Sequence, residues 1–344
     1  MASKYDRIKQ LVARLQLPDY RYRQILNAIF KQRIGEYARM QMLPASLRAA
    51  LAAELGPAVS CAAPAAENVS RQVTKTLLAL PDGAQIEAVA LRYKRGWESF
   101  CLSTQCGCGF ACRFCATGTL GLRRNMTAEE ITDQVLYLYF KGHELDSISF
   151  MGMGEPLANP ALFDALALLT DKSLLGLSPR RITVSTIGIL PGIQRLTRDY
   201  PQINLAFSLH SPFEEQRTEL MPINARFPLH AVLAALDEHI QNTGRKVFLA
   251  YVLLEGINDS PQHAAAVAGL LRGRGPWARL YHVDLIPYNA TDKTPRQFKP
   301  SDKQRVRKFR EKLESENISV TVRTQFGSDI AAACGQLHGA DAKL

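Results

Sequence analysis

Residues 101–115 read CLSTQCGCGFACRFC and contain five of the seven cysteines in the chain. Cys108, Cys112 and Cys115 form a C-x3-C-x2-C pattern after a short apolar run, SFCLS, that has the character of a β-strand. A short loop can turn three thiolates at these spacings toward one inorganic centre. Three ligands leave one iron of a four-iron cluster open, and that iron can bind a substrate directly. The pattern therefore predicts a catalytic 4Fe–4S cluster.

A structural zinc site is the alternative interpretation, with Cys106 as the fourth ligand. Cys106 and Cys108 are only two positions apart, which is tight for two ligands of one tetrahedral ion. In addition, no second C-x2-C pair follows in the sequence. Iron content after anaerobic purification separates the two possibilities.

The composition is that of a globular protein, with 47% hydrophobic and 22% charged residues in a chain of 344. The sequence has no secretion signal and no long apolar segment, so it predicts a cytoplasmic protein that does not enter a membrane. Cysteines in that compartment favour metal or redox chemistry over a disulfide framework. The net charge of +10 suits a partner with a phosphate backbone, although a basic soluble surface would give the same charge.

From about residue 99 onward, strand-like and helix-like segments alternate. The helix-like segments are amphipathic, and one of them begins with a capping box formed by Thr127 and Glu130. The alternation predicts parallel strands joined by right-handed crossovers, hence an α/β fold with a full or partial barrel. The predicted strands are SFCLS, SISFMGM, RITVST, INLAFSLH, KVFLAYVLL, LYHVDLIPY and SVTVRTQFG.

The chain before the barrel divides into two parts. Residues 1–70 predict a small helical domain, basic and interleaved with aromatics in a way that suits RNA contact, followed by an Ala- and Pro-rich linker from residue 57. Residues 71–98 predict a β-hairpin leading into a main domain that spans residues 99–344. The basic segment near residues 301–312 is also expected to contact phosphates.

Unusual residues gather at the predicted carboxyl ends of the strands, where β/α barrels build active sites. Within MGMGEP (151–156), we interpret Gly152 and Gly154 as allowing close approach to a ligand, and Glu155 as accepting a hydrogen bond from a cation. His210 is interpreted as a structural hydrogen-bonding residue. The residues at these ends are Cys108, Cys112, Cys115, Gly154, Glu155, Ser185, Ser208, Leu209, His210, Asn289 and Cys334.

Several motifs resemble those of the radical S-adenosylmethionine (SAM) methyltransferases that modify adenosine in 23S ribosomal RNA. The likeness runs from about residue 18 to 338. It is greater for the antibiotic-resistance (Cfr-type) branch than for the housekeeping (RlmN-type) branch, although Pro156 is similar to the housekeeping form. The motifs are GWESFC (96–101), TQCGC (104–108), DSISFMGMGE (146–155), FSLHSP (207–212) and LYHVDLIPYN (280–289).

The resemblance implies a partial (β/α)6-type radical SAM barrel with a small N-terminal helical domain. It implies that Cys108, Cys112 and Cys115 hold the cluster. It also implies 23S ribosomal RNA as substrate and an external one-electron reductant such as flavodoxin. The positions expected to bind SAM are Gly154, Glu155, Ser185, Ser208, Leu209, His210 and Asn289. Cys61 matches no functional position and is expected to be a small buried residue.

The resemblance assigns covalent chemistry to two further cysteines. Carbons 2 and 8 of adenine are electron-poor and cannot attack the methyl group of SAM, whereas a thiolate can. Cys334 is expected to take the methyl group from one SAM, and a second SAM to provide the radical that activates it. Cys101 is expected to release the product by forming a disulfide with Cys334. Glu87 or Cys101 would take the proton from the ring.

Three functions therefore remain open at this point. The first is methylation at carbon 8, which would crowd the antibiotic sites of the peptidyl transferase centre and confer resistance. The second is housekeeping methylation at carbon 2 of adenosine in ribosomal RNA, with transfer RNA as a further substrate. The third is a zinc-stabilised RNA-binding protein without catalysis. In either enzyme the target base would have to leave its stack to reach the barrel.

Overall fold

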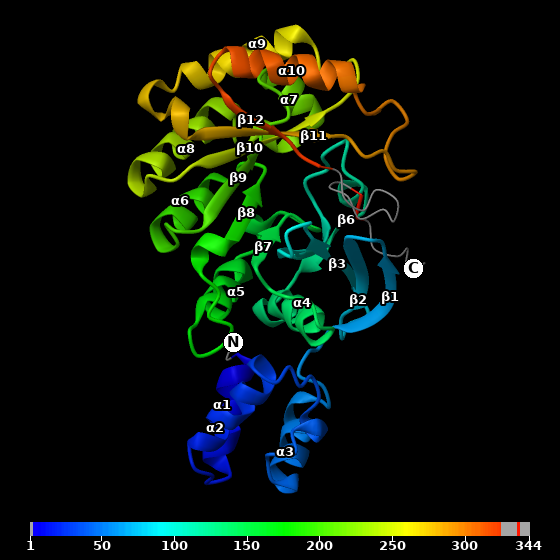
Figure 1. The fold of residues 1–344 in the computed structure, drawn as a ribbon, viewed down its shortest axis with the longest axis vertical. Helices are drawn as coiled ribbons and strands as arrows, with labels where there is room; N and C mark the ends of the chain where they lie inside the picture. The colour runs from blue at the N-terminus through cyan, green and yellow to red at the C-terminus, as the bar shows by residue number, and fades with distance from the viewer. Residues whose placement is uncertain (1–2, 325–335, 338–344) are drawn as a thin grey trace.

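A computed structural model describes residues 3–324 and 336–337 of the chain (Figure 1). Three helices begin it: α1 (Lys4–Arg14), α2 (Tyr20–Phe30) and α3 (Ala45–Leu55). α1 begins where the Ser3 side chain accepts from the Asp6 backbone N–H and the Asp6 carboxylate accepts from the Ser3 backbone N–H. The three helices share one apolar core, which also takes in Leu136 and Leu174 of the larger domain.

The larger domain is built on a ten-stranded sheet. Its strand order is β1-β2-β3-β4-β7-β8-β9-β10-β11-β12. Neighbours from β1 to β4 are antiparallel, whereas neighbours from β4 to β12 are parallel. The strands are β1 (Ala63–Val69), β2 (Val73–Ala79), β3 (Gln85–Arg92), β4 (Glu98–Cys101), β7 (Ser147–Phe150), β8 (Ile182–Thr186), β9 (Asn204–Ser208), β10 (Val247–Leu253), β11 (Tyr281–Pro287) and β12 (Ser319–Val322).

Seven strands of this sheet are the seven that the sequence predicts, so the β/α alternation is confirmed. Figure 1 shows the sheet curving as an open arc with helices on its outer side, which is the predicted partial barrel. The connecting helices are α4 (Ala128–Phe140), α5 (Ala161–Thr170), α6 (Leu190–Asp199), α7 (Glu214–Leu220), α8 (Leu229–Thr243), α9 (Pro261–Arg272) and α10 (Lys303–Ser315). No helix among residues 3–324 is long and apolar enough to cross a membrane.

Three details differ from the sequence predictions. Residues 63–69, expected to be linker, form β1. An Ala- and Pro-rich segment does not favour a strand by itself, but pairing with β2 supplies the backbone hydrogen bonds that stabilise one. The helix α6 was not predicted, since its Leu-Pro-Gly start has the composition of a turn. Cys61, expected to be buried, is exposed.

The loop after β4 contains a separate two-stranded hairpin, β5 (Gln105–Cys108) and β6 (Gly121–Asn125), which was also not predicted. Met126 follows the hairpin and is buried in the main core. The hairpin therefore anchors both ends of the cysteine loop to the barrel.

Candidate cofactor site and inner cavity

A cavity, here called the rim cavity, lies at the carboxyl ends of the parallel strands. Two of the predicted cluster ligands and most of the predicted SAM-binding residues line it. These are Cys112, Cys115, Gly154, Glu155, Ser185, Ser208 and His210. Residues that are far apart in the sequence therefore meet at the barrel rim, as the strand-end pattern predicts.

The three cysteines of the C-x3-C-x2-C pattern lie on one short loop in an apolar setting. Cys108 is the last residue of β5, and the Cys115 backbone N–H donates to the Cys112 carbonyl at 3.1 Å. Phe114, Met221 and other buried apolar residues pack around Cys112 and Cys115. Burial raises the pKa of the Cys108 thiol to about 12 and that of Cys112 well above its usual range. The charge of Cys115 also raises the pKa of both thiols.

The hairpin that presents Cys108 depends on a glycine. Gly107 has φ +82°, and a Cβ added there would lie 2.0 Å from the Gly121 carbonyl oxygen. Replacement of Gly107 by alanine is therefore expected to separate β5 from β6 and to lower both the melting temperature and the iron content per protein. The control is Gly83→Ala, because Gly83 has φ +77° but nothing within 4 Å of an added Cβ. Equal losses in the two variants would mean that backbone strain alone, not the contact with Gly121, explains the result.

The segment MGMGE after β7 packs against the backbone that leads to the cysteine loop. A Cβ on Gly152 would lie 2.6 Å from the Leu102 carbonyl, and the Gly152 N–H donates to that carbonyl at 3.0 Å. Gly154 has φ +94° and approaches the Gln105 side chain. The two glycines line the cavity as expected, but the close approach that requires them is to a neighbouring chain segment.

Glu155 is buried, and both its carboxylate oxygens accept backbone N–H groups. Oε1 accepts from Leu157 at 3.2 Å and Oε2 from Ile187 at 3.0 Å. Burial raises the pKa of Glu155 to about 7, against the opposing effect of hydrogen bonds from Thr186, Ile187 and Leu157. A cation in the rim cavity would favour the charged form, as expected for an acceptor of an ammonium group.

The His210 ring makes a structural hydrogen bond and also lines the rim cavity. Its Nδ1 accepts from the Val252 N–H at 3.0 Å, and Phe114 packs edge-on at 4.9 Å between ring centroids. Burial and the nearby Arg217 lower the pKa of His210 to about 3, so the ring is neutral with its proton on Nε2. His210 therefore holds β10 in place and can donate to a ligand. Leu209 is different, because its side chain lies in the main core and only its backbone is near the site.

Sequence reasoning missed Arg217, a fully buried arginine on α7. Its guanidinium donates to the carbonyls of Ile187 at 2.9 Å, Ser208 at 3.0 Å and Leu209 at 3.1 Å, and also to Asn224. It therefore joins the carboxyl ends of β8 and β9. Burial lowers its pKa to about 10, with Cys112 opposing that effect. The segment EEQRTEL resembles an exposed helix, so the sequence gives no sign of this burial.

A second cavity, here called the barrel cavity, lies inside the sheet and shares part of its wall with the rim cavity. Residues from the starts of the parallel strands, such as Ser99, Thr183 and Phe248, line it. Its volume is about 430 Å³, within the ~300–1,000 Å³ range of ligand pockets. The shared wall consists of Met151, Ile286, Pro287 and Arg323.

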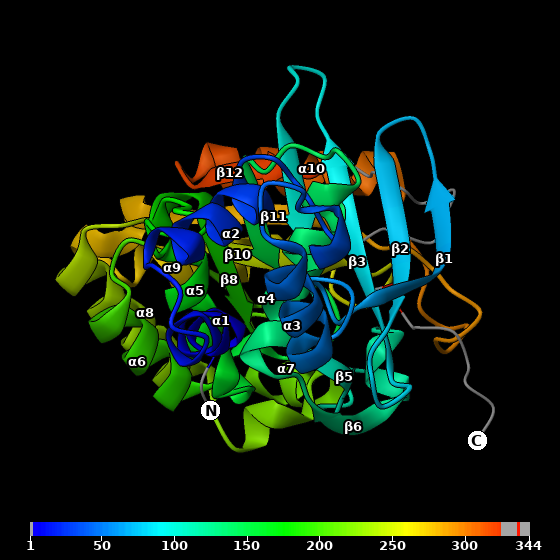
Figure 2. The same cartoon turned by 90° about the horizontal axis from the view of Figure 1, so that it is seen from below.

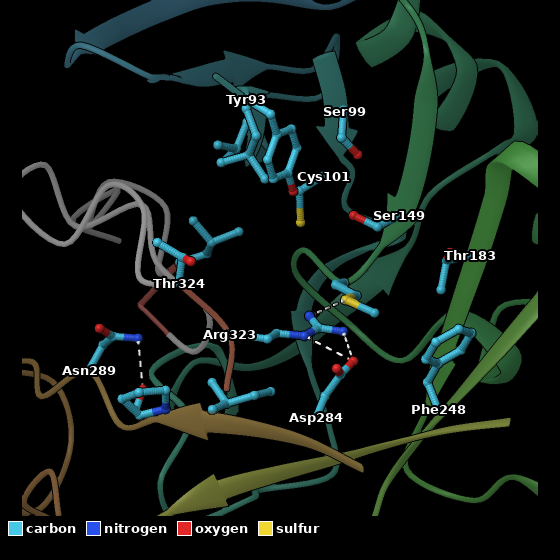
Figure 3. Close-up of a pocket in the computed structure, with 16 residues that line it drawn as sticks. Tyr93, Ser99, Cys101, Ser149, Thr183, Phe248, Asp284, Asn289, Arg323 and Thr324 are labelled. Atoms are coloured by element: carbon cyan, nitrogen blue, oxygen red, sulfur yellow. Dashed lines mark hydrogen bonds and ion pairs between the residues drawn. The ribbon is translucent and has the colours of Figure 1, made fainter. Parts of the chain in front are cut away.

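Cys101 points into the barrel cavity from β4, and Figure 3 shows its sulfur facing Arg323 across the space. Arg323 is held by Asp284, whose Oδ2 lies 2.7 Å from one guanidinium nitrogen and 3.1 Å from another. A further nitrogen of Arg323 lies 3.4 Å from the sulfur of Met151. Asn289, expected at the SAM site, lines the barrel cavity and is absent from the described lining of the rim cavity.

The two remaining candidates lie apart from these cavities or outside the described chain. Glu87 is buried on β3, and Lys75 lies 3.2 Å from its Oε1. Glu87 Oε2 has no hydrogen-bond partner in residues 3–324 and 336–337. Cys334 lies outside the described residues, so its place relative to Cys101 remains a prediction.

Comparison with known proteins agrees with this geometry. The Radical SAM superfamily pattern matches residues 102–267. The chain is 64% identical over 337 residues to the ribosomal RNA large subunit methyltransferase Cfr of Lachnoclostridium phytofermentans, covering 98% of both chains. The chain belongs to this family. A second Cfr methyltransferase, from Shouchella clausii, is 54% identical over 98% of this chain and 96% of its own.

A solved structure of a related methyltransferase has the same fold. The radical SAM methyltransferase from Sphaerobacter thermophilus superimposes with a TM-score of 0.91 and 38% identity, covering 98% of this chain and 99% of its own. The protein is therefore a radical SAM methyltransferase of the Cfr family. Members of the radical SAM superfamily use a 4Fe–4S cluster and SAM, so the rim cavity can be tested for its fit to both.

The residues present fit the cluster that the superfamily uses. Three thiols lie on one loop, and apolar side chains pack around Cys112 and Cys115. A cluster binds each sulfur at a different iron, so the three thiols need not converge on a single point.

Proposed function

We propose that this enzyme methylates carbon 8 of an adenosine in 23S ribosomal RNA at the peptidyl transferase centre. Its relatives are named ribosomal RNA large subunit methyltransferases, which supports the substrate class. The observation that carries the proposal is the shared wall between the rim cavity, with Cys112 and Cys115, and the barrel cavity, with Cys101. Cofactor and substrate would meet across that wall.

In this proposal Cys108, Cys112 and Cys115 hold the cluster. The Glu155 carboxylate and the His210 Nε2–H bind the polar groups of SAM, together with Ser185, Ser208 and the backbone near Gly154 and Leu209. When bound and reduced, the cofactors would supply a 5′-deoxyadenosyl radical able to remove a hydrogen atom from a methyl group. The apolar side chains packed around Cys112 and Cys115 would limit the access of water, which would protect such a reactive species from side reactions.

Cys334 is the proposed carrier of the methyl group. Its thiolate attacks the methyl carbon of one SAM, a new S–C bond forms, and S-adenosylhomocysteine leaves. A second SAM is consumed in activating the attached methyl group, so each turnover uses two. The activated carbon would then bond to carbon 8 of adenine. The adduct would return one electron to the oxidised cluster and give up the ring proton, which leaves the RNA linked to the enzyme through a thioether.

Cys101 is the proposed resolving residue. Its thiolate attacks the Cys334 sulfur and forms a disulfide, while the electrons of the broken S–C bond pass to the carbon, which takes a proton to become the methyl group. Glu87 is the proposed acceptor of the ring proton, since Oε2 has a free acceptor position among the described residues. An external thiol must reduce the disulfide, and a one-electron donor such as flavodoxin would serve the cluster.

Mass spectrometry of nucleosides from 23S ribosomal RNA treated with the purified enzyme, SAM and a reductant tests the proposal. We expect 8-methyladenosine, which requires the wild-type protein and disappears when Cys112 is replaced by alanine. Detection of 2-methyladenosine alone would establish the housekeeping reaction instead. Cells expressing the enzyme should grow at higher concentrations of antibiotics that bind the peptidyl transferase centre. Unchanged susceptibility despite methylation would separate the reaction from resistance.

A further inference from the structure

The hairpin between β3 and β4 extends beyond the body of the molecule, as Figure 2 shows from below. Its tip, residues 93–97 with the sequence YKRGW, is closed by two backbone hydrogen bonds. The Tyr93 N–H donates to the Trp97 carbonyl at 2.8 Å, and the Gly96 N–H donates to the Tyr93 carbonyl at 2.9 Å. Gly96 has φ +80°, which a turn of this kind requires. The tip is therefore an ordered turn with a defined shape.

The tip combines exposed aromatic rings with unpaired positive charge. Tyr93 is 37% exposed and Trp97 is 41% exposed. Lys94 and Arg95 are exposed between them, and within the described chain neither has an ion pair or a hydrogen bond from its side chain. The guanidinium of Arg181 lies 5.3 Å from the Trp97 ring centroid, but it also lies 3.8 Å from Asp146, so the unpaired charge of the tip is that of Lys94 and Arg95.

The same hairpin forms a wall of the barrel cavity. Val89 pairs with Cys101, and Leu91 pairs with Ser99. These four residues and Tyr93 all line the cavity, because they share one face of the hairpin. At about 3.3 Å per residue, Trp97 lies roughly 13 Å along the strand from Cys101. A nucleic-acid strand with one base in the cavity would thus place its neighbouring nucleotides against the tip.

We propose that the β3–β4 tip binds the single-stranded ribosomal RNA that flanks the target adenosine. Tyr93 and Trp97 stack on neighbouring bases, while Lys94 and Arg95 contact phosphates. Single-stranded RNA is bound in this way because every base has a face that can stack and every nucleotide carries a charge. The inference rests on the proposed function for the identity of the RNA.

Several cations of the other basic segments are already paired with carboxylates. On α10, Arg307 pairs with Glu311, Arg310 with Glu314 and Lys312 with Glu316. In the N-terminal helices and the loop after them, Arg7 pairs with Glu129, Arg14 with Glu54 and Arg33 with Glu144. A paired cation must lose its partner before it can bind a phosphate, so these six cations are less available than Lys94 and Arg95. The expected phosphate contact by α10 stays a prediction.

An acidic reductant protein could also be attracted to positive charge, but the position of the tip argues against it. The tip precedes the amino end of β4, whereas the cysteine loop follows the carboxyl end of the same strand. An electron donor must approach the cluster, which lies at the opposite end of the strand in our assignment. The exposed aromatic rings also suit stacking on bases better than contact with an acidic surface.

The test compares Lys94→Ala/Arg95→Ala with Arg307→Ala/Arg310→Ala, a control that removes the same charge from α10, where both cations are paired. The probe is an RNA fragment of the peptidyl transferase loop, and the Kd is measured at 50 and 200 mM salt. Two phosphate contacts on single-stranded RNA contribute about 1.4 to the slope of log Kd against log salt concentration. Between 50 and 200 mM salt, the affinity of the wild-type protein should therefore fall about 7-fold more than that of the tip variant. The α10 variant should match wild type.

Trp97→Ala and Trp97→Phe test the stacking contribution separately. Loss of one stacked base should weaken binding roughly 5- to 150-fold in the alanine variant, with most of the affinity restored by phenylalanine. Melting temperatures and iron content identify any variant that fails to fold. Wild-type affinity and salt dependence in the tip variant would overturn the proposal. So would slower reduction by flavodoxin with unchanged RNA affinity. If the wild-type enzyme binds the fragment without methylating it, the proposed function fails while these affinities still test the tip.

Discussion

Replacement of Cys101 by alanine is expected to abolish turnover and to leave the protein covalently attached to its RNA. The thioether between Cys334 and adenine has no ester or amide group that water could cleave. Its release depends on a second thiol, and Cys101 is the cysteine that faces the barrel cavity among the described residues. A denaturing gel should show a slow band that contains both macromolecules and disappears on treatment with either ribonuclease or protease.

Two further variants make this expectation specific. Cys61→Ala, at an exposed position outside both cavities, should methylate RNA like the wild-type enzyme. Cys101→Ala combined with Cys334→Ala should form no adduct, because the proposed carrier sulfur is absent. Persistence of the band in the double variant would place the link on another residue. Complete turnover by Cys101→Ala would remove Cys101 from the release step.

The barrel could be predicted from the sequence because its strands are short apolar runs separated by amphipathic helices. All seven predicted strands are present, and the polar residues at their carboxyl ends converge as a parallel topology requires. Glu155, Ser185, Ser208 and His210 meet at the rim for this reason. The prediction depends only on strand order and direction, which alternation of elements largely determines.

Features that depend on packing between distant segments could not be predicted. Asn289 follows β11 in sequence, but the sequence does not indicate that it lines the barrel cavity beside the shared-wall residue Pro287. Its expected contact with SAM stays a prediction. The β5–β6 hairpin was missed because the glycines and cysteines of its strands do not alternate as apolar and polar residues do. Arg217 lies in a charged stretch, and its burial follows from carbonyl groups contributed by two strands.

Replacement of Arg217 by methionine is expected to lower the melting temperature by roughly 6 °C or more. The substitution removes the arginine donor from the carbonyls of Ile187 and Ser208 and from the Asn224 side chain in a fully buried place, whereas the Leu209 carbonyl keeps the Ser211 N–H. Each unsatisfied buried acceptor costs about 1–3 kcal/mol, and 1 kcal/mol corresponds to about 2–4 °C in a large domain. The same substitution at Arg198, whose side chain is 71% exposed, provides the control and should change the melting temperature little.

Arg217→Lys separates charge from geometry. Lysine keeps a positive charge beside Cys112 but cannot reach carbonyls on two strands at once, because its donors share a single nitrogen. Ile187 both accepts from Arg217 and donates to Glu155, so loosening this contact should disturb the acceptor proposed for SAM. We therefore expect SAM to raise the melting temperature of Arg217→Lys less than that of the wild-type protein. An equal rise in both proteins would mean that Arg217 stabilises the fold without positioning the cofactor site.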